Sequence, residues 1–274
     1  MVARFSNDAE LTDFIEADRD RRLSLLVVNL EQPSAVRRMI DGAFASLPLD
    51  VAALDDEERG RNRLVLVDGE EVVAETPLDD LLDSFLLVNS DTYKTARDQL
   101  GSLRLPAVLT ELDETVFTVR GYPEADKEKL LLILLSRHVE QLAWRTGGGR
   151  LRSGFQYLSR LDDERGTAEV YRRLGDSTVE THVYGVPDRP DAVPDGVVGH
   201  GGDAADYRDS WFVVFRPGDD ASVEVDDGTA ADAVGSAGHA ALVATRTDAR
   251  RWRGVWTYDP ERVVAVDEFL REQL

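Results

Sequence analysis

The segment SRHVEQLAWRTGGGRLRSGFQYLS, residues 136–159, predicts the end of a long helix, a turn and the start of a strand. Apolar residues recur at helical spacing before it, and the three consecutive glycines at 147–149 end the helix. Residues 150–156 then read as a strand. Polar or amphipathic side chains gather where this pattern predicts burial: Arg137, Glu140, Trp144, Arg145 and Gln156. Because buried polar groups need partners, the segment indicates a recognition pocket more than a reaction centre.

Helical and strand patterns alternate on both sides of this segment. The long helix is predicted over about residues 124–145. Upstream we expect strands at 23–29, 49–54, 63–67, 72–74 and 115–120, and helices at 11–15, after Pro33, at 78–85 and at 106–112. Downstream we expect strands at 150–156, 179–186, 197–198, 210–215, 240–245 and 252–258, and helices at 167–174, 204–208 and from Pro260 onward. This order predicts the α/β class, or a mixed α+β fold, with a mixed β-sheet covered by helices.

We expect the chain to divide near residue 111. Residues 1–111 have a β-α-β pattern with a hairpin and form an α/β leader region packed on residues 112–274. Asn29-Leu-Glu-Gln-Pro follows the first strand, where a nucleotide-binding fold would carry a glycine-rich turn, so this region is interpreted as scaffold. Residues 90–106 fit either a surface helix or a loop, and the acidic residues 218–235 predict a mobile surface loop.

The net charge of −21, with three lysines among 32 basic residues, is typical of a protein adapted to high intracellular salt. Acidity then says little about partners, although the missing basic patch counts against direct nucleic-acid binding. The longest strongly apolar run, 130–135, is too short to span a bilayer, and no secretory signal is evident, so we expect a cytoplasmic protein without a membrane partner.

No residue is predicted to be catalytic, to hold a metal or to bind a known cofactor. The chain has no cysteine and no Gly-x-Ser-x-Gly elbow. His138 lies in the long helix without the ATP-binding motifs of a histidine kinase, and His182 is interpreted as a satisfied strand residue. His200 and His239 lie in glycine-rich loops without ligand spacing. The glycines at 147–149 follow a helix, which is the wrong order for a phosphate loop.

The remaining candidate is a ligand site on the long helix. Arg137, Glu140 and Trp144 share one side of it. Arg145 of the same helix and four residues of later strands are added to them. The predicted ligand-binding set is Arg137, Glu140, Trp144, Arg145, Gln156, Trp211, Trp256 and Tyr258. Two alternatives stay open: Arg137 and Glu140 pair with each other as a structural bridge, and the aromatic residues are ordinary core.

Several short motifs, in order, give the chain a resemblance to a known family. They are Ser136-Arg-His-Val-Glu140, Ala143-Trp-Arg145, the glycines at 147–149, Gly154-Phe-Gln156, Leu158-Ser159, Tyr184-Gly-Val-Pro187, Ser210-Trp-Phe-Val213, Ala241-Leu-Val-Ala244 and Trp256-Thr-Tyr-Asp-Pro260. With them residues 112–274 resemble the DICT sensory domain, and the whole chain resembles a stand-alone, salt-adapted member. It departs from the family pattern at His138 and in the acidic insertion at 218–235.

The resemblance implies a non-enzymatic sensory module that works with cyclic-dinucleotide enzymes, two-component proteins or transcription regulators, and it implies no established ligand. We therefore expect a cytoplasmic signal-input module that binds a small ligand or a partner and acts on a separate signalling or transcription-regulatory protein. A protein-interaction scaffold without a ligand is the alternative, and an uncharacterised enzyme is the third reading.

Overall fold

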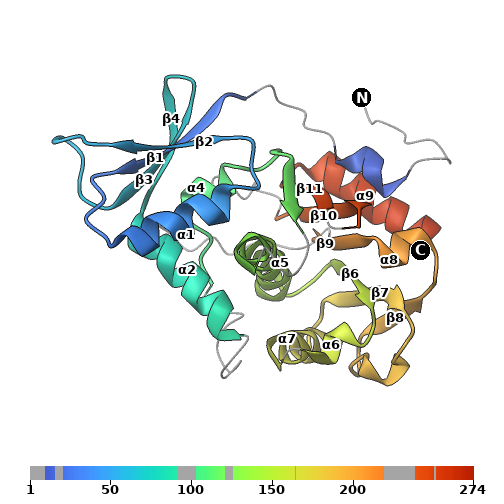
Figure 1. Cartoon of the computed structure of the whole chain (residues 1–274). Coiled ribbons are helices and arrows are strands. Elements are labelled where there is room, and N and C mark those ends of the chain that lie inside the picture. Colours follow the sequence, from blue (N-terminus) through green and yellow to red (C-terminus); the bar gives the residue numbers. More distant parts are fainter. Residues whose placement is uncertain are drawn as a thin grey trace.

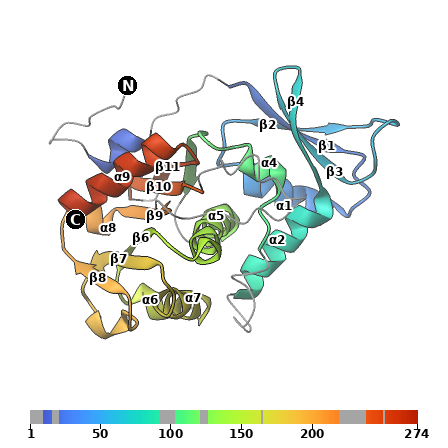
Figure 2. The same ribbon diagram turned by 180° about the vertical axis from the view of Figure 1, so that it is seen from behind.

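The computed structural model of the chain describes residues 10–15, 21–91, 103–120, 126–163, 165–218, 238–249 and 251–274. Its strands form a four-stranded and a seven-stranded sheet in this part of the chain, and the long helix lies between the first sheet's helices and the second sheet (Figures 1 and 2). The predicted α/β class with mixed β-structure covered by helices is confirmed, and the strands form two mixed sheets where one was expected.

The first sheet has the predicted β-α-β arrangement with a hairpin. Strand β1 (Leu23–Val28) leads through helix α1 (Ser34–Phe44) to the parallel strand β2 (Asp50–Leu54). Strands β3 (Arg63–Asp68) and β4 (Glu71–Pro77) form the hairpin, and the sheet order is β2-β1-β3-β4. Gly69, with a φ of 63°, occupies the hairpin turn, where a residue with a side chain would be strained. As an edge strand, β2 is more exposed than its apolar sequence suggested.

Helices α2 (Leu78–Asp91) and α4 (Ala107–Thr110) connect this sheet to strand β5 (Phe117–Arg120) and then to the long helix α5 (Asp126–Thr146). The predicted central helix is therefore present at nearly the predicted bounds. The helix expected at 11–15 is the short 3₁₀ helix η1 (Leu11–Phe14), and α2 extends beyond residue 85. Most of the ambiguous segment 90–106, the helix start at 121–125 and most of the acidic segment 218–235 lie outside the described residues.

The second sheet has the order β5-β11-β10-β9-β6-β7-β8. Its further strands are β6 (Arg150–Tyr157), β7 (Glu180–Val186), β8 (Val198–Gly201), β9 (Ser210–Arg216), β10 (Ala240–Asp248) and β11 (Arg251–Thr257). The connecting and covering helices are α6 (Arg160–Asp163), α7 (Arg165–Gly175), the 3₁₀ helix η2 (Pro190–Ala192), α8 (Ala205–Arg208) and α9 (Pro260–Gln273). Strands β6, β7 and β8 are parallel to one another, whereas the other neighbouring strands are antiparallel.

Side chains alternate between the two faces of the second sheet, so each central strand contributes to two cores. Leu242 and Trp256 point to the face that α5 covers, while Val243 and Val255 point to the face that α9 and η1 cover. On that second face the rings of Phe14 and Phe269 lie 5.3 Å apart. Helix η1, which belongs to the predicted leader region, thus packs with the last helix of the described chain.

Helix α5 contacts α1 and α2 on one side and the second sheet on the other (Figures 1 and 2). One hydrophobic core therefore includes Leu25 of the first sheet, Leu134 of α5 and Leu242 of the second sheet. A backbone hydrogen bond of 2.8 Å from Thr118 N to Ser46 O adds a polar tie between the two parts. The division of the chain at residue 111 stays a prediction. No helix in the described ranges is long and apolar enough to cross a membrane.

Candidate functional site

Arg137 and Glu140 pair with each other at the junction between α5 and α7. Nη1 of Arg137 donates to Oε2 of Glu140 over 2.6 Å, and Nη2 donates to Oγ1 of Thr167 over 2.7 Å. The hydroxyl of Tyr171 donates to the other carboxylate oxygen of Glu140 over 2.9 Å. Both oxygens of this buried carboxylate therefore have partners. The pairing that the i, i+3 spacing allowed is formed within α5, and the hydrogen bonds of the two residues to Thr167 and Tyr171 fasten α5 to α7.

The protonation states fit this arrangement. Burial, followed by the charge of Glu140, raises the pKa of Tyr171 well above its usual value, so its hydroxyl keeps its proton and donates. A buried carboxylate is stable only with such donors and a countercharge, and Glu140 has two donors, of which Arg137 is also the countercharge.

Gln156 is a buried residue of β6, and Trp211 of β9 lies between the sheet and α5. Gln156 sits at a bulge of β6 with a φ of 55°, a left-handed conformation that is uncommon for a residue other than glycine. Its Nε2 donates to Ser210 O over 2.5 Å and so fastens the bulge to β9. Nε1 of Trp211 donates to Oγ of Ser136 over 3.1 Å, which joins the same strand to α5.

Trp256 and Tyr258 lie towards the β11 side of α5, and both are buried. Nε1 of Trp256 and the hydroxyl of Tyr258 have no hydrogen-bond partner among the described residues. The ring of Tyr258 meets that of His138 edge to face, with centroids 5.9 Å apart. Burial raises the pKa of Tyr258, and burial together with Arg145 lowers the pKa of His138 to about 4, so both rings are neutral near pH 7.

Trp144 and Arg145 lie in the last turn of α5, and both are exposed; Trp144 exposes 38% of its surface. The structure thus distributes the predicted ligand-binding residues around α5 in four places. Arg137 and Glu140 face α7, Gln156 and Trp211 belong to β6 and β9, Trp256 and Tyr258 lie towards β11, and Trp144 and Arg145 reach the surface. That these residues bind a ligand stays a prediction.

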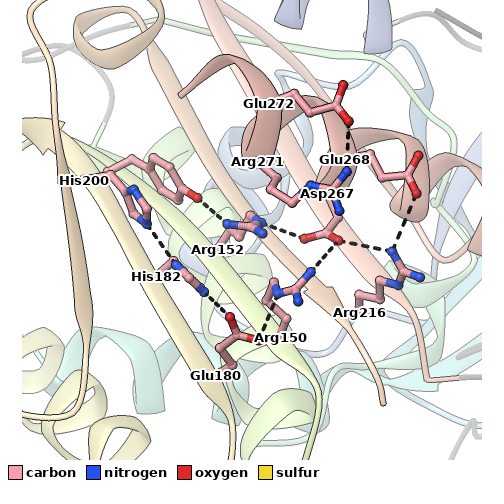
Figure 3. A network of polar contacts seen from close by, with 11 residues as sticks. Arg150, Arg152, Glu180, His182, His200, Arg216, Asp267, Glu268, Arg271 and Glu272 are labelled. Atoms are coloured by element: carbon pink, nitrogen blue, oxygen red, sulfur yellow. Dashed lines mark hydrogen bonds and ion pairs between the residues drawn. The ribbon is translucent and has the colours of Figure 1, made fainter. Parts of the chain in front are cut away.

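A second polar cluster lies on the other face of the same sheet, beneath α9 (Figure 3). Its centre is Asp267, a residue of α9 with 1% of its surface exposed. Nε of Arg152 donates to one carboxylate oxygen over 2.6 Å. Nη1 of Arg150 and Nη1 of Arg216 each approach the other oxygen at 3.3 Å. Three guanidinium groups from β6 and β9 therefore hold one buried carboxylate of the last helix.

The network continues from the arginines to two histidines (Figure 3). Nη1 of Arg152 donates to the hydroxyl of Tyr184, and Nε of Arg150 donates to Glu180 over 3.1 Å. Nε2 of His182 lies 2.9 Å from Oε1 of Glu180, and its Nδ1 lies 2.9 Å from Nε2 of His200.

The ring of His200 stacks on that of Tyr184 with centroids 4.4 Å apart. Because Tyr184 contacts Arg152, the chain of contacts leads back to Asp267. This closed set of residues is called the Asp267 ring below: Asp267, Arg152, Tyr184, His200, His182, Glu180 and Arg150. It joins α9 to β6, β7 and β8.

Sequence reasoning did not find this ring. His182 is a satisfied strand residue, as expected, but its partners come from two strands. The signal that was available is Asp267, an acid at helical spacing between Val263 and Leu270, both of which face the core. Arg150 and Arg152, at alternate positions of one strand, could have supplied its countercharge. No group of three or more possible metal ligands occurs in the ranges that the structure describes.

Residues 106–223 match the family model described as DICT, sensory domain in diguanylate cyclases and two-component system. The matched segment contains α4 to β9, and with them Arg137, Glu140, Gln156 and Trp211, whereas Trp256, Tyr258 and α9 lie beyond it. The match supports the predicted resemblance and a sensory role.

No curated protein matches the chain. Among solved structures, the crystal structure of polyphosphate kinase from Porphyromonas gingivalis is similar, with 10% sequence identity and a TM-score of 0.33. The alignment covers 98% of this chain and 49% of that one, so the chain spans about half the length of the kinase. A likeness this distant carries no argument about function.

Proposed function

We propose that this chain is a non-enzymatic signal-input module of the cytoplasm, adapted to high salt, which binds a small ligand or a partner and passes a conformational change to a separate output protein. The match of residues 106–223 to a sensory family carries the proposal. The output protein is a signalling or transcription-regulatory protein, in keeping with the two-component systems in the family description.

Helix α5 is the element on which we expect the signal to act. It is fastened to α7 by Glu140 and to β9 by Ser136, and it packs on α1 and α2 of the first sheet. A shift of this helix would change contacts with several layers at once, because packed elements move between discrete arrangements and do not deform continuously.

Two buried donors that have no hydrogen-bond partner among the described residues support a ligand beside α5. Buried polar groups nearly always have a hydrogen-bond partner, so each exception calls for an explanation. Nε1 of Trp256 can only donate, and the hydroxyl of Tyr258 can donate or accept. A ligand atom that accepts a hydrogen bond would satisfy either group. The full set proposed to hold the ligand is the predicted one: Arg137, Glu140, Trp144, Arg145, Gln156, Trp211, Trp256 and Tyr258.

A protein-interaction scaffold without a ligand is the second candidate. The observation that favours it is the mutual pairing of Arg137 and Glu140, whose polar atoms Thr167 and Tyr171 also engage. On this reading Arg137 and Glu140 hold each other and α7, and they do not bind a ligand.

The two candidates differ in what the natively purified protein retains. Mass spectrometry of the small molecules released from the protein is expected to find a compound in a fixed ratio to the chain. Tyr258→Phe and Trp256→Phe each remove one unpartnered donor while keeping an aromatic ring, and both are expected to lower the retained amount. Tyr157→Phe is the matched control, because Tyr157 is exposed.

The free energy of unfolding of Tyr258→Phe tests the case in which no ligand is bound. If no ligand uses the hydroxyl of Tyr258, Tyr258→Phe removes a buried unsatisfied group and stabilises the protein by about 1 kcal/mol in urea unfolding. Such a gain, together with no retained compound, would refute the ligand part of the proposal and favour the scaffold.

A further inference from the structure

The two histidines of the Asp267 ring form a contact that accepts one extra proton but not two. Nε2 of His182 donates to Glu180, because a carboxylate only accepts. In the neutral ring of His182, Nδ1 then carries a lone pair, and Nε2 of His200 donates to it across 2.9 Å. With both rings neutral, each donor in this contact meets an acceptor.

The first additional proton keeps the contact. A doubly protonated His182 donates from both nitrogens, to Glu180 on one side and to His200 on the other. His200 stays neutral and carries its hydrogen on Nδ1, so that its Nε2 accepts. The positive charge on His182 then lies beside the carboxylate of Glu180, which compensates it.

A second proton breaks the contact. With both rings protonated, two N–H groups would point at each other at hydrogen-bonding distance, and neither would have an acceptor. The rings are stacked with centroids 5.1 Å apart, so the two positive charges would also repel each other. Burial lowers the pKa of both histidines, and the charge of Arg152 adds to the effect in each case.

The surroundings offer little to offset that second charge. The charged and titratable groups that face the pair are Glu180 and Tyr184 of β7, Arg150 and Arg152 of β6 and, beyond the arginines, Asp267 of α9, while Tyr207 of α8 acts on Tyr184. Of these, Glu180 is the anion in contact with a histidine. Asp267 is already shared by three guanidinium groups.

Strand β8, which carries His200, contributes few packed side chains. It has four residues and forms the edge of the sheet, with β7 as its neighbour. Two of the four are Gly199 and Gly201, which have no side chains to pack, and Val198 exposes 47% of its surface. Backbone pairing with β7 runs from Val198, opposite His182, to Gly201, opposite Gly185, and the contacts of the His200 ring with His182 and Tyr184 add side-chain contacts to it.

We propose that the His182–His200 pair is an acid-sensitive latch, in which the second proton drives the two rings apart and releases β8 from the edge of the sheet. The release also removes the His200 ring from Tyr184, whose hydroxyl accepts from Arg152, and so loosens one side of the Asp267 ring beneath α9. The latch is a property of the fold and does not depend on the proposed signalling function.

The test is amide hydrogen exchange of the full chain at a series of pH values and constant high salt, with histidine NMR to follow the two rings. The two histidines are expected to titrate at separate midpoints. As the pH falls through the lower midpoint, exchange at residues 198–201, corrected for its intrinsic pH dependence, is expected to rise about ten-fold. Exchange in β9 and β10 is expected to stay unchanged, which separates local release from global acid unfolding.

His200→Phe is the decisive variant, because it keeps a ring on Tyr184 and cannot take up a proton. In this variant the step in exchange is expected to vanish. If it does not fold, Glu180→Gln replaces it; without that carboxylate the upper midpoint is expected to move to lower pH. Independent titration of the two histidines near pH 6.5, or an unchanged step in His200→Phe, overturns the latch.

Discussion

His138 should make the protein lose stability in mild acid. Burial and the nearby charge of Arg145 lower the pKa of His138 from 6.5 to about 4. Above pH 6.5 the ring is neutral in both the folded and the unfolded chain, so stability is at its plateau. Below pH 6.5 the unfolded chain takes up a proton that the folded chain refuses, so the free energy of unfolding falls as the pH falls, until the folded ring is protonated near pH 4.

The size of this loss follows from the pKa difference. Each pKa unit corresponds to about 1.4 kcal/mol, and the interval from 6.5 to about 4 therefore gives at most about 3 to 4 kcal/mol. The figure is an upper bound because part of the His138 residue is exposed, although its Nε2 is buried.

Urea unfolding of the wild type and of His138→Phe, at pH values from 7.5 to 4 and constant salt, measures the effect. Phe keeps an aromatic ring against Tyr258 and has no proton to gain. The other histidines contribute equally to both proteins, so the difference between the two pH profiles isolates His138. Parallel profiles, or an NMR midpoint of His138 near 6.5, would refute the reasoning.

Two further substitutions test the buried carboxylate of the Asp267 ring and the glycine turn that precedes β6. Asp267→Asn removes the carboxylate that three guanidinium groups share, and we expect it to destabilise the protein by about 3 kcal/mol or more. Glu268→Gln, on the exposed side of α9, is the control. Equal losses of stability in the two variants would contradict a buried charge at Asp267. Gly149→Ala would place a Cβ 2.4 Å from Arg216 O at a φ of 104°, so we expect a loss of about 3 kcal/mol in thermal or urea unfolding. Gly148→Ala, which meets nothing within 4 Å, is expected to change little.

The sequence was most informative where local pattern and local structure coincide. The apolar spacing before residue 136, the glycines and the residues after 149 predicted α5 and β6 almost residue for residue. The i, i+3 spacing of Arg137 and Glu140 also predicted their pairing as one alternative, and the structure shows that pair.

Contacts between distant segments were not predictable in the same way. Arg152 and Asp267 are 115 residues apart, and their meeting depends on which strand neighbours β6 and on where α9 crosses the sheet. Neither is encoded in periodicity. The parallel register of β7 and β8, which brings His200 beside His182 and Tyr184, is likewise set by the packing of the whole sheet.

The strand order also bears on how this protein can be shortened. The segment similar to the sensory family, 106–223, contains β5 and β9 but not β10 and β11, which stand between them. In the described sheet β5 pairs with β11, and β9 has β10 as one neighbour. A fragment cut at the limits of the similarity would therefore have a gap of two strands in the middle of its sheet. We expect the smallest autonomously folding unit to include β10, β11 and α9. The folding unit is then longer than the segment 106–223 that is similar to the sensory family.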